Sequence, residues 1–285
     1  MTIERITGEI DWPSAPRKEL DSLIGWFGRY RSCAVAFSGG VDSSLLAYAA
    51  RAAIVDGAVA VFSKSPATPS SEARNARQIA SEIGIELLVV EQNDLASPGY
   101  VANSANRCYF CRSNLASAME PIIKERCIEV SVDGTHADDM KSPRPGVKAL
   151  REAGFKAPFV ELGIGKEEIR QIARYAGLSN SDRPSEACLS SRIAFGQRVD
   201  DVTLHMVEQA ELAVREITHA STIRVRVIGG DALVEVDPGC VATALENRAV
   251  IESALARVGF ANVRIAEDGY LPGRMLELFA KTERT

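Results

Sequence analysis

Short apolar runs alternate with amphipathic stretches along the first two thirds of the chain. The runs have the length of buried strands and span 33–37, 58–62, 85–90 and 127–132. The stretches between them repeat apolar residues at helical spacing over 17–30, 45–50, 70–83, 113–125, 147–154 and 166–175. Strands that alternate with helices in this way predict an α/β fold with a doubly wound parallel sheet.

The pattern changes after the polar stretch 180–198, which contains no long apolar run. The remaining residues predict a helix, two strands, a second helix and a last strand, over 202–217, 223–228, 232–236, 241–258 and 263–266. We therefore predict two domains, residues 1–198 and residues 199–285. The second is a smaller α/β domain, too short to hold another nucleotide-binding sheet, so we expect it to complete a site or an oligomer contact.

The composition is that of an ordinary globular chain, with 46% hydrophobic and 25% charged residues. The net charge of −5 gives no general attraction for nucleic acid. No window has the composition of a leader or a membrane span, so we expect a cytoplasmic protein without a membrane partner. Six cysteines in such a chain fit a disulfide framework poorly, and they favour a metal-binding or catalytic role for some of them.

A glycine pair between the first apolar run and the helix that follows predicts a phosphate-binding turn. Glycines allow a positive φ and close approach to a ligand, and the first N–H groups of the helix have no partner within it. The residues concerned are Ser38, Gly39, Gly40, Asp42, Ser43 and Ser44. No lysine of the Walker type follows, and the stretch resembles the SGGxDS signature of the PP-loop ATP pyrophosphatases. The alternative is a simple turn capped by Asp42 or Ser43.

Three cysteines carry a second signal. Cys108 and Cys111 form a C-x-x-C motif where a helix is expected to start, and Cys188 lies in the polar stretch 180–198. Both segments are expected at the carboxyl edge of the sheet, where open α/β folds bind ligands. Three thiolates there suit three corners of a [4Fe-4S] cluster with one open iron. A redox dithiol, half of a zinc site and a chance pair are the alternatives.

The other cysteines are expected to be structural. Cys33 and Cys127 fall within apolar runs and are predicted to be core residues, and Cys240 follows a Pro-Gly turn.

Several charged side chains are candidates for ligand binding. Asp42 suits a Mg²⁺ ion that bridges ATP phosphates, and Asp133, with Asp138 and Asp139, follows the fourth apolar run. These last three carboxylates suit the same Mg²⁺ or the orientation of a substrate. Helix capping is the alternative for Asp42 and for one or two of the three. Arg107 and Arg192 flank the cysteines and suit a substrate carboxylate or phosphate, unless each pairs with a neighbouring acid.

Two further arginines alternate with apolar residues in the run 223–228. Arg224 and Arg226 therefore lie on one face of a strand, with no acidic residue between them. Such a pair suits the phosphate of a mononucleotide, and a solvated strand face is the alternative.

Taken together, six segments resemble the LarE family of ATP-dependent sulfur transferases, which belongs to the PP-loop ATP pyrophosphatases. The segments are 38–44, 106–111, 133–139, 144–146, 184–192 and 223–227. The resemblance implies that Ser63 lies where the backbone contacts adenine. It also implies an enzyme that adenylates a carboxylate of pyridinium-3,5-biscarboxylic acid mononucleotide and converts it to a thiocarboxylate during synthesis of the nickel-pincer nucleotide of lactate racemase. ATP, Mg²⁺ and, in the three-cysteine subgroup, a [4Fe-4S] cluster are the implied cofactors.

The source of the sulfur differs between members of the family. In single-cysteine members the residue that matches Cys188 gives up its own sulfur, whereas the additional Cys108 and Cys111 match the subgroup with a cluster. We favour the cluster as sulfur donor. The resemblance further implies a homo-oligomer, a trimer or hexamer, and transient contact with other enzymes of the pathway.

The sequence departs from the family pattern at three places. His136, the pair Ser142-Pro143 and Arg183 stand where the family commonly has Asn, Asp-Tyr and Lys.

Three other functions compete with a sulfur transferase. They are a PP-loop tRNA thiolase, an amide-forming synthetase of the NAD or GMP type and a non-enzymatic nucleotide or redox sensor. The acidic net charge disfavours the tRNA enzyme, and an amide-forming enzyme has no use for the three cysteines.

Overall fold

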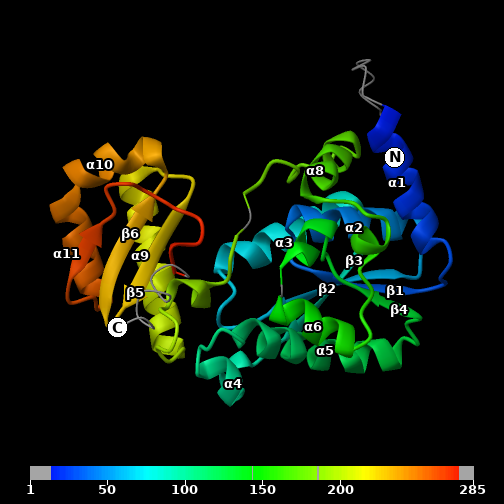
Figure 1. The fold of residues 1–285 in the computed structure, drawn as a ribbon, viewed down its shortest axis with the longest axis horizontal. Coiled ribbons are helices and arrows are strands. Elements are labelled where there is room, and N and C mark those ends of the chain that lie inside the picture. The colour runs from blue at the N-terminus through cyan, green and yellow to red at the C-terminus, as the bar shows by residue number, and fades with distance from the viewer. Residues whose placement is uncertain (1–13, 143, 185, 276–285) are drawn as a thin grey trace.

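The computed structural model describes residues 14–142, 144–184 and 186–275. Its central element is a four-stranded parallel sheet with the order β3-β2-β1-β4 (Figure 1). The strands are β1 (Cys33–Phe37), β2 (Ala58–Lys64), β3 (Glu86–Glu91) and β4 (Val130–Val132). All four apolar runs thus form strands, and the predicted parallel sheet is confirmed.

Helices cover both faces of this sheet, as a doubly wound fold requires (Figure 1). One face packs against α1 (Ser14–Phe27), α2 (Val41–Ala53), α3 (Ser70–Ile83) and α8 (Lys166–Tyr175), and the other against α5 (Arg107–Glu125) and α6 (Pro145–Glu152). Strand β1 shows the cause, because Cys33 and Val35 belong to the core on the first face and Ala34 and Ala36 to the core on the second. The predicted doubly wound α/β fold is therefore confirmed.

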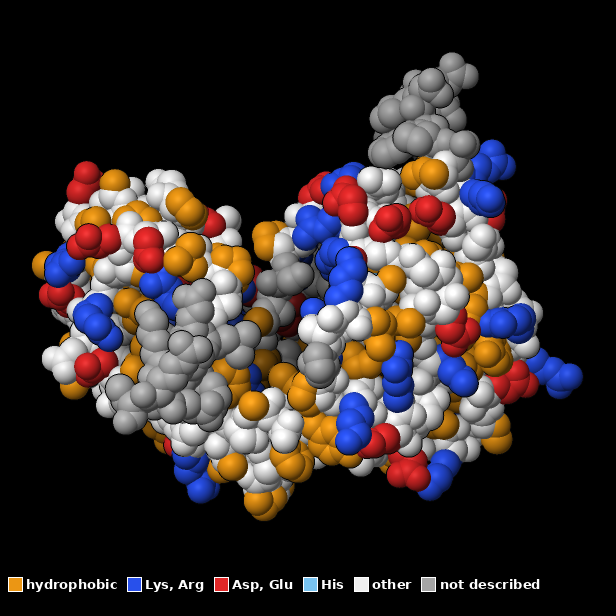
Figure 2. Space-filling model, viewed as in Figure 1, with side chains coloured by type: hydrophobic (Ala, Val, Ile, Leu, Met, Phe, Trp, Pro, Cys, Tyr) orange, Lys and Arg blue, Asp and Glu red, His pale blue; other side chains and the backbone are white. Residues whose placement is uncertain are grey.

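A second, three-stranded sheet follows in the chain. Its strands are β5 (Ile223–Ile228), β6 (Asp231–Val236) and β7 (Val263–Ile265), in that order, and α9 (Asp201–Thr218), α10 (Val241–Glu246) and α11 (Arg248–Val258) share a core with them. Tyr100, Leu189 and Ile193 also belong to this core. Figure 2 shows a hollow between this part and the part that carries β1 to β4. The domain boundary after residue 198 stays a prediction.

Two sequence-based expectations about local structure are wrong. Cys127 is exposed and has a φ of 50°, because the chain turns sharply after α5 and β4 begins only at Val130. The helix expected over 241–258 is interrupted at Asn247, which separates α10 from α11. The described part also contains the short helices α4 (Pro98–Val101) and α7 (Pro158–Glu161), for which the apolar pattern gives no signal.

Within the described ranges, no helix is both long enough and apolar enough to cross a membrane.

Candidate active site

The turn between β1 and α2 is fixed by hydrogen bonds within it. The Ser43 hydroxyl accepts from the backbone N–H of Ser38 at 3.2 Å and donates to the carbonyl of Gly40 at 3.0 Å. Gly39 has a φ of 78°, and a Cβ there would lie 2.7 Å from Nδ2 of Asn75. Only glycine fits this position. Helix α2 starts directly after Gly40, so the turn presents the N-terminal end of a helix dipole.

Two asparagines that the sequence does not single out hold this turn from outside. Nδ2 of Asn75 and Nδ2 of Asn180 donate to the carbonyl of Gly39 at 3.0 and 2.8 Å. Asn180 also donates to the hydroxyl of Ser44 at 2.9 Å, and Ser44 is fully buried. The Ser44 side chain therefore serves the fold of the turn, whereas its role in phosphate binding stays a prediction.

The carboxyl end of β4 lies directly against Asp42. A Cβ on Gly134 would come within 3.0 Å of Cβ of Asp42, and Nζ of Lys166 lies 2.5 Å from Oδ1 of Asp42. Lys166 is the first residue of α8, where a positive charge opposes the helix dipole. The sequence does not single out Lys166, because its contact with Asp42 joins residues far apart in the chain. Asp42 and Lys166 together put opposite charges beside the phosphate-binding turn.

The three carboxylates after β4 have different environments. Asp133 is buried and accepts hydrogen bonds from the backbone N–H and the hydroxyl of Thr135, and burial raises its pKa. Asp138 accepts from the backbone N–H of Lys166 at 2.8 Å, and Asp139 accepts from that of His136 at 3.2 Å. Asp138 and Asp139 thus make the capping contacts named as the alternative. Asp133 directly precedes Gly134, the residue that contacts Asp42.

Ser63, near the end of β2, is linked through Gln92 to α5, the helix that carries Cys108 and Cys111. Its hydroxyl donates to Oε1 of Gln92 at 2.6 Å, and Nε2 of Gln92 donates to the carbonyl of Cys111 at 2.9 Å and to Asp94 at 2.7 Å. The Ser63 side chain is occupied within the protein, so its expected contact with adenine rests on its backbone.

The three predicted cysteines come from two segments. Cys108 and Cys111 lie three residues apart in the first turns of α5, with Cys108 exposed and Cys111 half-buried, and Cys188 is exposed in the loop before the 3₁₀ turn η3 (Leu189–Arg192). Burial, with smaller contributions from the negative charges of Asp94, Cys188 and Cys108, raises the pKa of Cys111 to about 12. In the described ranges, no three His, Cys, Asp or Glu side chains converge on a single metal ion.

The raised pKa of Cys111 predicts slow alkylation in protein that carries no cluster. At pH 8 a thiol with a pKa of about 12 is roughly a thousandfold less ionised than an ordinary thiol with a pKa of about 8.5, and only the thiolate reacts. Of the three candidate ligands, we expect iodoacetamide to modify the exposed Cys108 and Cys188 well before Cys111. Peptide mass spectrometry over time measures the order of labelling. Labelling of Cys111 as fast as that of Cys108 and Cys188 contradicts the raised pKa of the Cys111 thiol.

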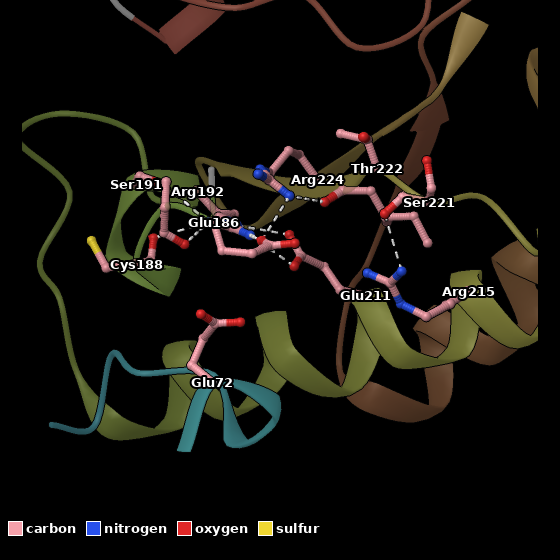
Figure 3. A network of polar contacts seen from close by, with 12 residues as sticks. Glu72, Glu186, Cys188, Ser191, Arg192, Glu211, Arg215, Ser221, Thr222 and Arg224 are labelled. Carbon is pink, nitrogen blue, oxygen red and sulfur yellow. Dashed lines mark hydrogen bonds and ion pairs between the residues drawn. The ribbon is translucent and has the colours of Figure 1, made fainter. Parts of the chain in front are cut away.

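The loop that carries Cys188 is held by a fully buried arginine (Figure 3). Nη1 of Arg192 donates to the carbonyls of Ala187 at 2.5 Å and of Cys188 at 3.0 Å. Its Nε and Nη2 donate to the two carboxylate oxygens of Glu211 in α9, at 2.8 and 3.0 Å. Figure 3 shows the sulfur of Cys188 directed away from this pair. The pairing with a neighbouring acid, named as the alternative for Arg192, is the arrangement found.

Arg107 supports the same loop from the other side. The guanidinium is buried, its Nη1 donates to the carbonyl of Ser190 at 2.8 Å, and it also contacts Oδ1 of Asn103. The hydroxyl of Tyr100 lies 2.5 Å from that of Ser190. These contacts connect the start of α5, which carries Cys108 and Cys111, to the loop of Cys188.

Arg224 and Arg226 are buried, so the alternative of a solvated strand face is wrong. Nε of Arg226 donates to Glu235 of β6 at 2.8 Å and its Nη1 to the carbonyl of Ser191 at 3.1 Å. Arg224 lies 3.4 Å from Glu186, which also lies 3.9 Å from Arg192. Burial lowers the pKa of Arg224, and the charge of Arg192 lowers it further. Arg224 therefore shares a glutamate with a second arginine, and its role in binding a phosphate stays a prediction.

Comparison with known proteins finds relatives over most of the chain. The asparagine synthase family matches residues 30–106, the segment that contains the phosphate-binding turn. An uncharacterized protein of Synechocystis sp. is 34% identical over 92% of this chain and 98% of its own length. The pyridinium-3,5-bisthiocarboxylic acid mononucleotide synthase of Lactiplantibacillus plantarum is 26% identical over 87% and 90% of the two chains. A chain of the glutamine-hydrolyzing GMP synthase of Methanopyrus kandleri is 27% identical over 57% and 56%. The chain belongs to the LarE family of PP-loop, ATP-dependent enzymes.

Proposed function

We propose that the protein is an ATP-dependent sulfur transferase that converts a carboxylate of pyridinium-3,5-biscarboxylic acid mononucleotide to a thiocarboxylate. The observation that carries the proposal is the placement of Cys188. Its exposed thiol lies on a loop that Arg192 and Arg226 hold through backbone carbonyls, beside the buried Arg224. A nucleophile next to a loosely paired arginine suits an anionic acceptor. The name of the Lactiplantibacillus relative supports the choice of acceptor.

The first step activates the acceptor. The turn from Ser38 to Ser44 would bind the phosphates of ATP. Asp42 would hold Mg²⁺, and Lys166, whose Nζ lies 2.5 Å from Asp42, would add positive charge. A carboxylate oxygen of the acceptor attacks the α-phosphorus, the bond from that phosphorus to the bridging oxygen breaks, and pyrophosphate leaves. The product is an acyl-adenylate, whose carbonyl carbon now has AMP as leaving group.

The second step transfers sulfur. The sulfur nucleophile attacks the carbonyl carbon, the C–O bond to AMP breaks, and a thiocarboxylate results. A [4Fe-4S] cluster held by Cys108, Cys111 and Cys188 would supply a sulfide for this attack, and cysteine thiolates are the usual ligands of such a cluster. If Cys188 itself is the donor, its Sγ forms a thioester, and elimination with loss of the Cα proton breaks the Cβ–Sγ bond and leaves dehydroalanine.

The decisive experiment supplies ATP, Mg²⁺ and the dicarboxylate mononucleotide to protein prepared without oxygen. We expect pyrophosphate and AMP in equal amounts, and an acceptor mass that rises by one sulfur in place of one oxygen. Iron and acid-labile sulfide content, together with the mass of the Cys188 peptide after turnover, distinguish the two sulfur sources. Asp42→Asn is expected to lose pyrophosphate release. ATP cleavage that proceeds equally without acceptor contradicts the proposal.

A further inference from the structure

A cleft of about 850 Å³ lies beside α5, outside the phosphate-binding turn and the Cys188 loop. Its walls come from α5, from α6 and from the 3₁₀ turn η2 (Ala137–Lys141). Tyr109 and Phe110 contribute aromatic rings, and Met140 and Pro145 add apolar surface. Ligand pockets in proteins are commonly roughly 300–1,000 Å³ and mostly apolar, with a few polar groups that fix orientation. The cleft therefore has the size and lining of a small-molecule site.

Of the four basic side chains that line the cleft, three pair with carboxylates. Lys141, Arg144 and Lys148 lie 2.6, 2.9 and 3.8 Å from the carboxylates of Asp138, Asp139 and Glu152. Arg151 also lines the cleft, and among the residues that the structure describes it forms no ion pair. Its Nη2 lies 3.2 Å from the sulfur of Met140. A guanidinium against a thioether, with no carboxylate partner, suits an anionic group of a ligand.

The aromatic wall adds a preference for a flat ring. Tyr109 and Phe110 meet edge to face, with ring centroids 5.8 Å apart, and the Tyr109 hydroxyl donates to Glu152 at 2.6 Å. That hydrogen bond, together with the contact between the rings, restricts the orientation of Tyr109. Aromatic walls bind planar rings, and they favour rings with positive charge through cation–π attraction.

The cleft adjoins α5, the helix that carries Cys108 and Cys111. Helix α6 packs closely against α5. A Cβ on Gly146 would lie 3.3 Å from the carbonyl oxygen of Cys108 and 3.7 Å from the Cβ of Cys108. On the other side, the charges of Arg112 and Arg151 oppose part of the rise that burial causes in the pKa of Asp133. Arg151 is therefore within electrostatic reach of the carboxyl end of β4, where Gly134 contacts Asp42.

We propose that this cleft binds the carboxylate-bearing ring of the sulfur acceptor, a planar aromatic dicarboxylate, and that Arg151 pairs with one carboxylate. The inference rests on the proposed function for the identity of the ligand. The cleft supplies what such a ring needs: a guanidinium that forms no ion pair with a described residue, an aromatic wall, and a place beside the helix that carries Cys108. A pyridinium ring also gains from Tyr109, because its positive charge faces the π system.

The test measures the binding of two probes, pyridine-3,5-dicarboxylate and its N-methylpyridinium form. Saturation-transfer NMR detects binding, and NMR titration gives the Kd. We expect both probes to bind the wild type, and the Kd to rise at least fivefold in Arg151→Gln and in Tyr109→Leu. Lys124→Gln is the control, because it removes a cation from the far end of α5, the helix that carries Tyr109, outside the cleft. Unchanged binding in Arg151→Gln and Tyr109→Leu overturns the proposal, as does the absence of binding to a folded wild type.

Turnover separates this inference from the proposed function. Probe binding needs neither ATP nor sulfur, so it survives if the wild type transfers no sulfur. If the wild type does form the thiocarboxylate, Arg151→Gln is expected to raise the KM for the acceptor and leave ATP binding unchanged. An unaltered acceptor KM in Arg151→Gln would overturn the ring site and leave the proposed function standing.

Discussion

Replacing Cys188 with serine is expected to abolish sulfur transfer while ATP-driven pyrophosphate release continues. A serine hydroxyl is neither a thiolate ligand for iron nor a donor of sulfur, so the loss applies to both sulfur sources and is expected to be roughly a thousandfold or more. The phosphate-binding turn lies between β1 and α2 and has its own hydrogen bonds. Adenylation therefore does not depend on the thiol, and the two half-reactions separate in this variant.

The measurement follows pyrophosphate and thiocarboxylate in parallel. Because the Cys188 side chain is exposed and its loop is held through backbone carbonyls by Arg192, Cys188→Ser is expected to keep the fold. Cys127→Ser is a matched control, since Cys127 is another exposed thiol, at the opposite end of α5 from Cys108. Thiocarboxylate formation at the wild-type rate in Cys188→Ser would remove Cys188 from the mechanism.

Local patterns predict most of the first sheet because its elements are determined locally. The strand over 33–37 and the helices over 70–83 and 166–175 have the predicted bounds. Each strand is a short apolar run, and Gly84, with a φ of 72°, ends α3 where the periodic pattern ends. The pattern fails at Asn247, where apolar residues continue at helical spacing through a break, because periodicity does not report a single non-helical residue.

The environment of the arginines is harder to predict, because it depends on partners distant in the sequence. Alternating charged and apolar residues in β5 look like a strand with one solvated face, yet Arg224 and Arg226 are buried. Their partners Glu186 and Glu235 come from a loop and from the neighbouring strand. Spacing within one strand carries no information about what covers it. Asn180 is missed for the same reason, since it reaches the phosphate-binding turn from a segment far along the chain.

Glu211→Met is expected to destabilise the protein by about 3–5 kcal/mol, the usual cost when one partner of a buried ion pair is removed. Arg192 is fully buried, and both oxygens of Glu211 bind it, so the substitution leaves a buried guanidinium without its carboxylate. The backbone N–H of Val225 also loses its acceptor, because it donates to Glu211 at 3.1 Å. The free energy of unfolding in urea measures the loss.

A double-substituted chain shows whether the loss comes from the pair. The double variant Arg192→Met with Glu211→Met removes both buried charges. Its destabilisation is therefore expected to be smaller than the sum of the destabilisations in the two single variants. Glu216→Met, on the exposed side of α9, is the control and is expected to change little. A loss below about 1 kcal/mol in Glu211→Met would show that the pair does not stabilise the fold. Because Arg192 also binds the carbonyl of Cys188, loss of the pair is expected to disorder the loop and to reduce sulfur transfer even in folded protein.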